Sequence, residues 1–197
     1  MKSCAIILDP QYDYLESGPI RARNSNRVLQ NLMPIMAQSD WVIVTRDVHP
    51  ENHFSFKDEP TFTDGSWPPH CVKGTDGARI FPAIRKRADF ILSKGLSPVP
   101  PDDYSAFKAK KLRPLMDLTD ILGSIQKQVD EIIVAGFLLE TGVQATAFDC
   151  NALSNANDRW SQVTVPLEAC GTILNAAGVA KIIEPMIKAG INIIDYA

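Results

Sequence analysis

Short apolar runs alternate with amphipathic stretches along most of the chain. The runs are rich in Val, Ile and Leu, and they occupy Cys4–Leu8, Trp41–Thr45, Phe90–Ser93, Glu131–Ala135, Gln162–Val165 and Ile191–Ile194. Their apolar character is continuous rather than alternating, which is typical of strands buried on both faces of a parallel sheet.

Four segments between these runs have the composition of amphipathic helices. They are Asn26–Gln38, Asp117–Gln128, Gly142–Asn155 and Asn175–Lys188. The second of them has a clean i, i+3, i+4, i+7 pattern of apolar side chains at Leu118, Ile121, Leu122 and Ile125. The alternation of strands and helices, with right-handed crossovers, predicts an α/β protein with a three-layer α/β/α arrangement.

Two long segments, Arg46–Ile80 and Leu96–Arg113, have no convincing periodicity. Structureless loops of this length inside a compact domain are usually functional. The second segment carries a basic stretch, Lys108–Lys111. We interpret this stretch as a solvated face. Its alternative role is contact between the subunits of a homo-oligomer.

The bulk composition excludes several classes of partner. A length of 197 residues suits one α/β domain, which we expect to cover residues 1–197. A formal net charge of -3 gives no electrostatic basis for binding nucleic acid, and no apolar run approaches the roughly 18 residues of a membrane span. The cysteines have no paired spacing and the chain opens without a signal peptide, so we expect reduced thiols in a cytoplasmic protein.

Reactive or unusual residues follow four of the predicted strands. Asp9 follows the first strand, Asp47 and His49 the second, Lys94 the third and Gly142 the fourth. In a parallel α/β sheet, ligand sites form beyond the carboxyl ends of the strands. One charge at such a position is usually a cap or a surface residue, but four consecutive strand ends of this kind predict a functional site.

All three histidines, His49, His53 and His70, fall within the irregular segment 46–80. Asp47 and His49 are two positions apart, so an extended segment can point both side chains to one side. One carboxylate with two or three imidazoles suits a divalent metal, with zinc, iron and manganese as the candidates. Hydrogen bonding of these histidines to nearby backbone is the competing interpretation, and their confinement to one segment favours the metal.

Asp9 needs a partner if it is buried, because an unpaired carboxylate at the end of a central strand is costly. Lys94, at the end of the next strand but one, can supply that partner. As a functional pair, Asp9 would accept or donate a proton and Lys94 would tune its pKa. A purely structural ion pair is the alternative.

Five motifs along the chain point to a known family. They are Asp9–Tyr14, which reads D-P-Q-Y-D-Y, then Arg46–Phe56, Trp67–Ala78, Lys94–Gly95 with Asp103–Phe107, and Val134–Ala147. In this order, from about residue 4 to residue 170, they resemble the isochorismatase-like cysteine hydrolases, and nicotinamidases most closely. The segments that contain the histidines are the most specific part of the likeness.

The resemblance implies a six-stranded, mainly parallel sheet. It implies a divalent metal, zinc first, held by Asp47, His49 and His70, with His53 as a fourth ligand. It also implies that the ligand is a small planar amide whose ring is enclosed by three aromatic side chains, Tyr14, Trp67 and Tyr104.

In enzymes of this kind, residues equivalent to Asp9 and Lys94 act with a cysteine to hydrolyse an amide covalently and release ammonia. The amides of Leu138, or its neighbour, and of residue 142 would form the oxyanion hole. The cysteine position, however, holds Gly142 in this chain. Glycine keeps the backbone amide and the turn, but it cannot form a thioester.

The sequence offers no credible replacement nucleophile for Gly142. We interpret Cys71 as structural, and Cys150 lies two helical turns further along, roughly 12 Å away. Thr141 is adjacent but is expected to point away from the site.

Three functions are compatible with a glycine at position 142. The first is a nicotinamidase-like amidase framework whose covalent nucleophile is absent, naturally or by engineering. The second is a non-covalent hydrolase of the isochorismatase type, with Asp9 as general acid; family members that act on isochorismate resemble this chain in having glycine there but generally lack the full histidine set. The third is a catalytically silent binding protein. We rank them in this order.

Overall fold

A computed structural model describes residues 1–62, 64–100, 104–112, 115–125, 129–157 and 160–194. Each of the six predicted strands is present, as β1 (Ser3–Leu8), β2 (Trp41–Asp47), β3 (Phe90–Lys94), β6 (Glu131–Phe137), β7 (Gln162–Pro166) and β9 (Asn192–Ile194). They lie side by side in the order β3-β2-β1-β6-β7-β9, and each neighbouring pair is parallel. The mainly parallel sheet is therefore confirmed.

Within the part of the chain that the structure describes, the sheet has nine strands, so the expected count of six is wrong. The additional strands are β4 (Lys110–Leu112), β5 (Leu115–Asp117) and β8 (Cys170–Gly171). Strands β4 and β5 extend the sheet antiparallel beyond β3. Each of these strands is short and lacks the continuous run of apolar residues by which the other six are recognised, which is why the sequence pattern misses them.

The segment Leu96–Arg113 is correspondingly less irregular than its sequence indicates. It contains a 3-10 turn, Ala106–Lys108, followed by β4. Within the basic stretch, the ammonium group of Lys111 lies 5.7 Å from the centre of the Phe90 ring. This lysine therefore covers part of the sheet edge, as a cation–π contact, instead of only facing solvent.

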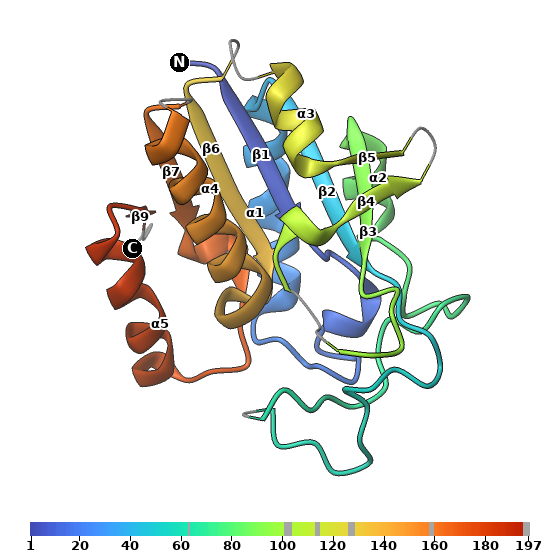
Figure 1. Ribbon diagram of the computed structural model, residues 1–197. Helices are drawn as coiled ribbons and strands as arrows, with labels where there is room; N and C mark the ends of the chain where they lie inside the picture. Colours follow the sequence, from blue (N-terminus) through green and yellow to red (C-terminus); the bar gives the residue numbers. More distant parts are fainter. Residues whose placement is uncertain (63, 101–103, 113–114, 126–128, 158–159, 195–197) are drawn as a thin grey trace.

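Helices cover both faces of the sheet, which confirms the three-layer arrangement (Figure 1). Helices α3 and α4 lie on one face and α1 and α2 on the other, while α5 packs beside α4. Their bounds are α1 Ser25–Gln38, α2 Pro82–Arg87, α3 Leu118–Ile125, α4 Gln144–Asn157 and α5 Ala176–Lys188. The second predicted helix was expected to reach Gln128, and residues 126–128 lie outside the described residues.

Among the residues that the structure describes, no helix has the length and apolar character that crossing a membrane requires.

The apolar side chains form one core around the central strands. All six residues of β1 are buried, because β2 and β6 flank this strand and helices cover both faces of the sheet.

The parallel strands all end at one edge of the sheet, and the irregular segment 48–81 runs across this edge (Figure 1). Three isolated β-bridges fix the position of this segment. They join His49 to Val72, Phe56 to Trp67 and Ile80 to Gln11. The fold therefore brings the histidine-bearing segment over the strand ends, where the reactive residues were expected.

Leu32 on α1 has no exposed surface, so Leu32→Ala removes buried apolar area and leaves a cavity. We expect the free energy of unfolding, measured by urea denaturation, to fall by about 2–5 kcal/mol. The matched control is Leu115→Ala on β5, where the leucine is 72% exposed. That substitution should change the free energy of unfolding by less than about 0.5 kcal/mol. Equal effects at the two positions would contradict this account of the core.

Candidate active site

Lys94, the last residue of β3, joins two buried carboxylates at the edge of the sheet. Its Nζ lies 2.7 Å from Asp9 Oδ2 and 2.6 Å from Asp47 Oδ1. The strand register explains this meeting, because Lys94 pairs with Asp47 across β2 and β3, and Asp9 directly follows β1. The ion pair expected between Asp9 and Lys94 is present. The second pair, with Asp47, is not foreseen from the sequence.

Electrostatics give the two carboxylates different properties. Burial, aided by the charge of Asp47, raises the pKa of Asp9 to about 7 against the opposing effect of Lys94. Burial is the largest single influence on Asp47 and would raise its pKa, but the charges of Lys94, His49 and His70 and the hydrogen bond from Lys94 together outweigh burial and hold this pKa below its usual range. Burial likewise opposes the charge on Lys94, and the two carboxylates more than compensate, so its pKa is raised. Asp9 is thus the member of the cluster that can exchange a proton near neutral pH.

Two polar residues that the sequence analysis does not single out hold the two aspartates, one by a carboxylate oxygen and the other by the main chain. The hydroxyl of Thr45 donates to Asp9 Oδ1 at 2.7 Å. The side-chain oxygen of Gln11 accepts from the Asp47 amide at 2.7 Å, and its nitrogen donates to the Asp47 carbonyl at 2.8 Å. Both residues could have been found from the sequence by their positions. Thr45 is a polar residue within the apolar strand β2, and Gln11 is a polar residue shortly after the apolar strand β1.

Tyr14 has a contact that the ring-enclosing role does not predict. Its hydroxyl donates to Asp47 Oδ2 at 2.6 Å. Both Asp47 oxygens therefore accept a hydrogen bond, because Oδ1 already accepts from Lys94. Each carboxylate oxygen has two acceptor sites, so Asp47 still has lone pairs to offer a cation.

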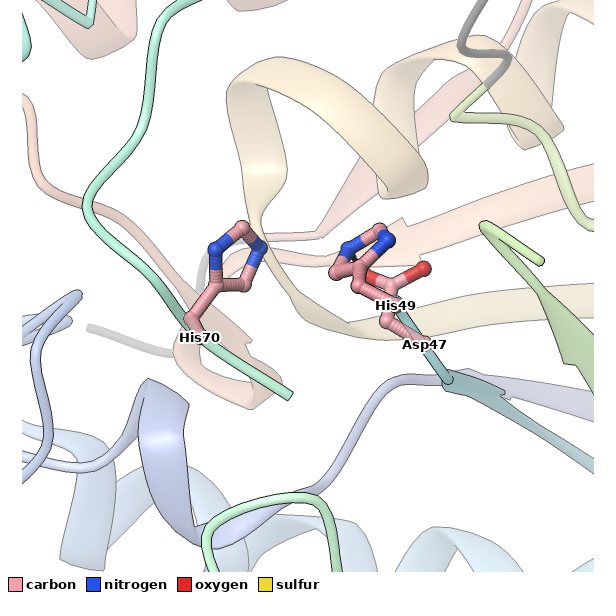
Figure 2. Close-up of side chains that lie close together, drawn as sticks. All are labelled: Asp47, His49 and His70. Atoms are coloured by element: carbon pink, nitrogen blue, oxygen red, sulfur yellow. Dashed lines mark ion pairs between the residues drawn. The ribbon is translucent and has the colours of Figure 1, made fainter. Parts of the chain in front are cut away.

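Asp47, His49 and His70 offer ligand atoms that lie within 4.8 Å of one another. Figure 2 shows Asp47 and His49 at the end of β2 and His70 approaching from a separate segment. Nδ1 of His49 lies 2.9 Å from the Gly95 carbonyl, and Nδ1 of His70 lies 2.9 Å from the Pro68 carbonyl. A carbonyl can only accept, so each Nδ1 carries its proton and each Nε2 keeps a lone pair, as in metal-bound histidines.

Burial also keeps these imidazoles in the form that binds metals. It lowers the pKa of His70 to about 4, with His49 adding to the effect, and it lowers the pKa of His49. Neutral imidazole is the species that coordinates a cation. One carboxylate and two oriented, neutral imidazoles therefore fit a divalent metal.

His53 stands beside this triad, with its ring centre 4.2 Å from that of His49. Its Nδ1 lies 2.8 Å from the hydroxyl oxygen of Ser55. Its role as a fourth ligand stays a prediction.

A small cavity joins the metal triad to the residues expected to enclose a planar ring. It is lined by Tyr14, Asp47, His49, Trp67, His70, Tyr104, Leu138 and Thr141. The indole nitrogen of Trp67 donates to the Tyr104 hydroxyl at 3.0 Å, which ties two of the aromatic side chains together. Thr141, which is adjacent to Gly142, also lines the cavity.

Gly142 lies in a short π-type turn, Leu139–Val143, between β6 and α4. A Cβ atom added to this glycine would lie 3.4 Å from the Phe137 carbonyl oxygen, 3.5 Å from that of Tyr104 and 3.7 Å from Asp9 Oδ2. These are ordinary van der Waals contacts. A side chain at position 142 would therefore fit, and it would start out beside the Asp9 carboxylate.

The four cysteines are all unpaired and buried, and none is among the described residues that line the cavity. Burial raises the pKa of each, to about 12 at Cys170. A buried thiol of raised pKa forms little thiolate, the reactive species. This agrees with the interpretation that none of them replaces the missing nucleophile.

The fold and this arrangement of residues agree with comparisons to known proteins. The family model for the isochorismatase domain matches residues 3–197. The chain therefore belongs to the isochorismatase family.

Among its relatives are nicotinamidases. The nicotinamidase of Escherichia coli (strain K12) is 30% identical over 160 residues, covering 73% of this chain and 74% of that protein. The nicotinamidase/pyrazinamidase of Mycobacterium tuberculosis is 32% identical over 152 residues, covering 73% and 76%. A solved pyrazinamidase of Pyrococcus horikoshii, in complex with zinc, superposes with a TM-score of 0.77 at 27% identity and full coverage of both chains. The resemblance to nicotinamidases inferred from the motifs is confirmed.

The raised pKa of Asp9 predicts a pH-dependent difference between the parent protein and Asp9→Asn. The folded parent binds this proton more tightly than the unfolded chain, so ionisation of Asp9 lowers stability as the pH rises from the usual value of 3.8 to about 7. Asparagine cannot ionise, and Lys94 keeps its partner Asp47. The free energy of unfolding of Asp9→Asn should therefore rise relative to that of the parent across this window. Urea denaturation at several pH values measures it, and a difference that does not change with pH would contradict the prediction.

Proposed function

We propose that the chain is a metal-dependent hydrolase framework of the nicotinamidase type, which binds small planar carboxamides and lacks the covalent nucleophile because Gly142 occupies its position. The observation that carries this proposal is the buried pairing of Lys94 with both Asp9 and Asp47. This one lysine joins a proton-exchanging carboxylate to a member of the metal triad. Relatives named nicotinamidase and nicotinamidase/pyrazinamidase support the class of ligand.

Asp47, His49 and His70 would hold the metal, with zinc the first choice because a similar pyrazinamidase is solved in complex with zinc. The bound cation would act as a Lewis acid that holds a nitrogen or oxygen of the ligand. Trp67 and Tyr104 would enclose the ring, and Tyr14 would border it.

The remaining residues would act on the carboxamide itself. The amides of Leu138 and Gly142 would face the carbonyl oxygen, Asp9 would move protons, and Lys94 would hold Asp9 in place. Cytoplasmic location and assembly as a homo-oligomer stay predictions.

Metal binding can be tested separately from catalysis. We expect one zinc ion per chain, measured by calorimetric titration of metal-free protein and by elemental analysis. His70→Ala removes a ligand and should weaken binding by at least about 100-fold. His53→Ala is the matched comparison: an equal loss would add His53 to the ligands, and unchanged affinity would limit the site to three. A parent protein that binds no stoichiometric metal contradicts the site.

Gly142→Cys should restore covalent amide hydrolysis, because the added side chain fits and starts beside Asp9. Ammonia release from nicotinamide and pyrazinamide should be at least about 1,000-fold faster than in the parent, as expected for return of a nucleophile that works in concert with other groups. The control is the double variant Asp9→Asn/Gly142→Cys, which should lose most of this gain. Ordinary enzymic rates in the parent would show that the covalent step is not missing.

A further inference from the structure

Cys71, which directly follows His70 of the metal triad, has an unusual backbone conformation. Its φ is +46°, in the left-handed region that residues other than glycine rarely occupy. A residue with a side chain keeps such a conformation only where its surroundings hold it there. The hydrogen bonds of the Cys71 backbone supply that restraint.

The side chain of Asp13 makes the first of these bonds. Its Oδ2 accepts from the Cys71 amide at 2.7 Å, the short distance that is typical of a charged acceptor. This amide nitrogen is bonded to the carbonyl carbon of His70, so the contact holds the chain directly where His70 ends. The His70 ring is held separately, because its Nδ1 lies 2.9 Å from the Pro68 carbonyl. The backbone and the ring of this ligand are therefore both fixed.

The carbonyl of Cys71 makes the second bond and connects the two histidine-bearing segments. It accepts from the His49 amide at 3.0 Å, and the His49 carbonyl in turn accepts from the Lys73 amide at 2.8 Å. These bonds form the isolated bridge between His49 and Val72. The position of Cys71 therefore sets how His49 and His70 lie relative to each other.

Asp13 is itself firmly held, in the 3-10 turn Tyr12–Tyr14 that follows β1. Its amide donates to the Gly77 carbonyl at 3.1 Å, and its carbonyl accepts from the Ile20 amide at 3.1 Å. The carboxylate lies directly against Gly77, because a Cβ atom built on this glycine would overlap the carboxylate atoms. Only a glycine at position 77 leaves room for the carboxylate in this place.

We propose that Asp13 is a positioning residue of the metal site, whose carboxylate fixes the Cys71 amide and thereby the approach of His70 to Asp47 and His49. The inference rests on the metal triad of the proposed function and deepens it. It gives a residue outside the triad and outside the irregular segment a part in metal binding.

A carboxylate near a cation could also strengthen metal binding through its charge alone. Two substitutions separate charge from position. Asp13→Asn removes the charge and keeps an oxygen that can accept from the Cys71 amide. Gly77→Ala keeps the charge, but its methyl group displaces the carboxylate. The φ of Gly77 lies outside the left-handed region and the atoms to be displaced end a flexible side chain, so this variant should fold.

Calorimetric titration of the metal-free full chain with zinc is the first measurement. Asp13→Ala and Gly77→Ala should each weaken zinc binding by at least about 10-fold, the lower end of the effect expected when a group that orients a metal ligand is lost. Asp13→Asn should stay within about 3-fold of the parent, because a neutral acceptor gives a weaker bond but keeps its direction. Gly123→Ala is the matched control for Gly77→Ala and should bind as the parent does, since a Cβ atom there meets no atom within 4 Å.

Nuclear magnetic resonance of the histidine rings is the second measurement, and it needs no metal. The chain has only three histidines, so their ring signals can be assigned. In the metal-free protein, the His70 signals should change in Asp13→Ala and Gly77→Ala and return towards the parent values in Asp13→Asn. The amide signals of β1 should stay the same in all three, which a general loss of structure would not allow.

Two results would overturn the inference. One is a Gly77→Ala variant with the zinc affinity and the His70 signals of the parent. The other is an Asp13→Asn variant that binds zinc as weakly as Asp13→Ala, which would mean that Asp13 acts through its charge. Failure of the proposed function looks different: a parent that binds no zinc contradicts the metal site, while the ring signals of the metal-free variants still decide whether Asp13 positions His70.

Discussion

A single ammonium group buried between two carboxylates is the interaction on which this site depends. Removing three charges from water costs several kcal/mol per ion, and close pairing at 2.6 and 2.7 Å is what offsets that cost. Lys94 cannot satisfy both carboxylates unless β1, β2 and β3 are adjacent and end at the same level. The order and register of these strands are therefore a condition for the chemistry as well as for the fold.

The two aspartates that contact Lys94 differ in their charge state and in the groups that they face. Asp47, stabilised as an anion by Lys94 and hydrogen-bonded by Tyr14, faces the two histidines. Asp9, more isolated from compensating charge, titrates near neutral pH and faces position 142. One lysine thus separates a permanent anion suited to holding a metal from a carboxylate suited to moving protons.

Much of this structure could be predicted from the sequence, because its long elements have strong periodicity. The buried strands, the four longer helices and the gathering of Asp9, Asp47 and Lys94 at the strand ends follow from apolar runs and parallel topology. The pairing of β4 with β5 could not be predicted, because neither strand contains a run of Val or Ile. The second partner of Lys94 and the contact of Tyr14 depend on register and rotamer, which single positions in a sequence do not encode. The place of Thr141 beside the cavity depends likewise on the path of the π-type turn.

The burial of every thiol has a consequence for the conditions in which the site can work. A hydrolase that relies on a low-pKa cysteine in an open cavity is exposed to oxidation and alkylation of that cysteine. Here the cavity is lined by hydroxyl, imidazole, carboxylate, aromatic and aliphatic groups, and the four thiols lie in the interior. Among the described residues that line the cavity, there is therefore no sulfur for peroxide, thiol reagents or thiol-seeking heavy metals to attack.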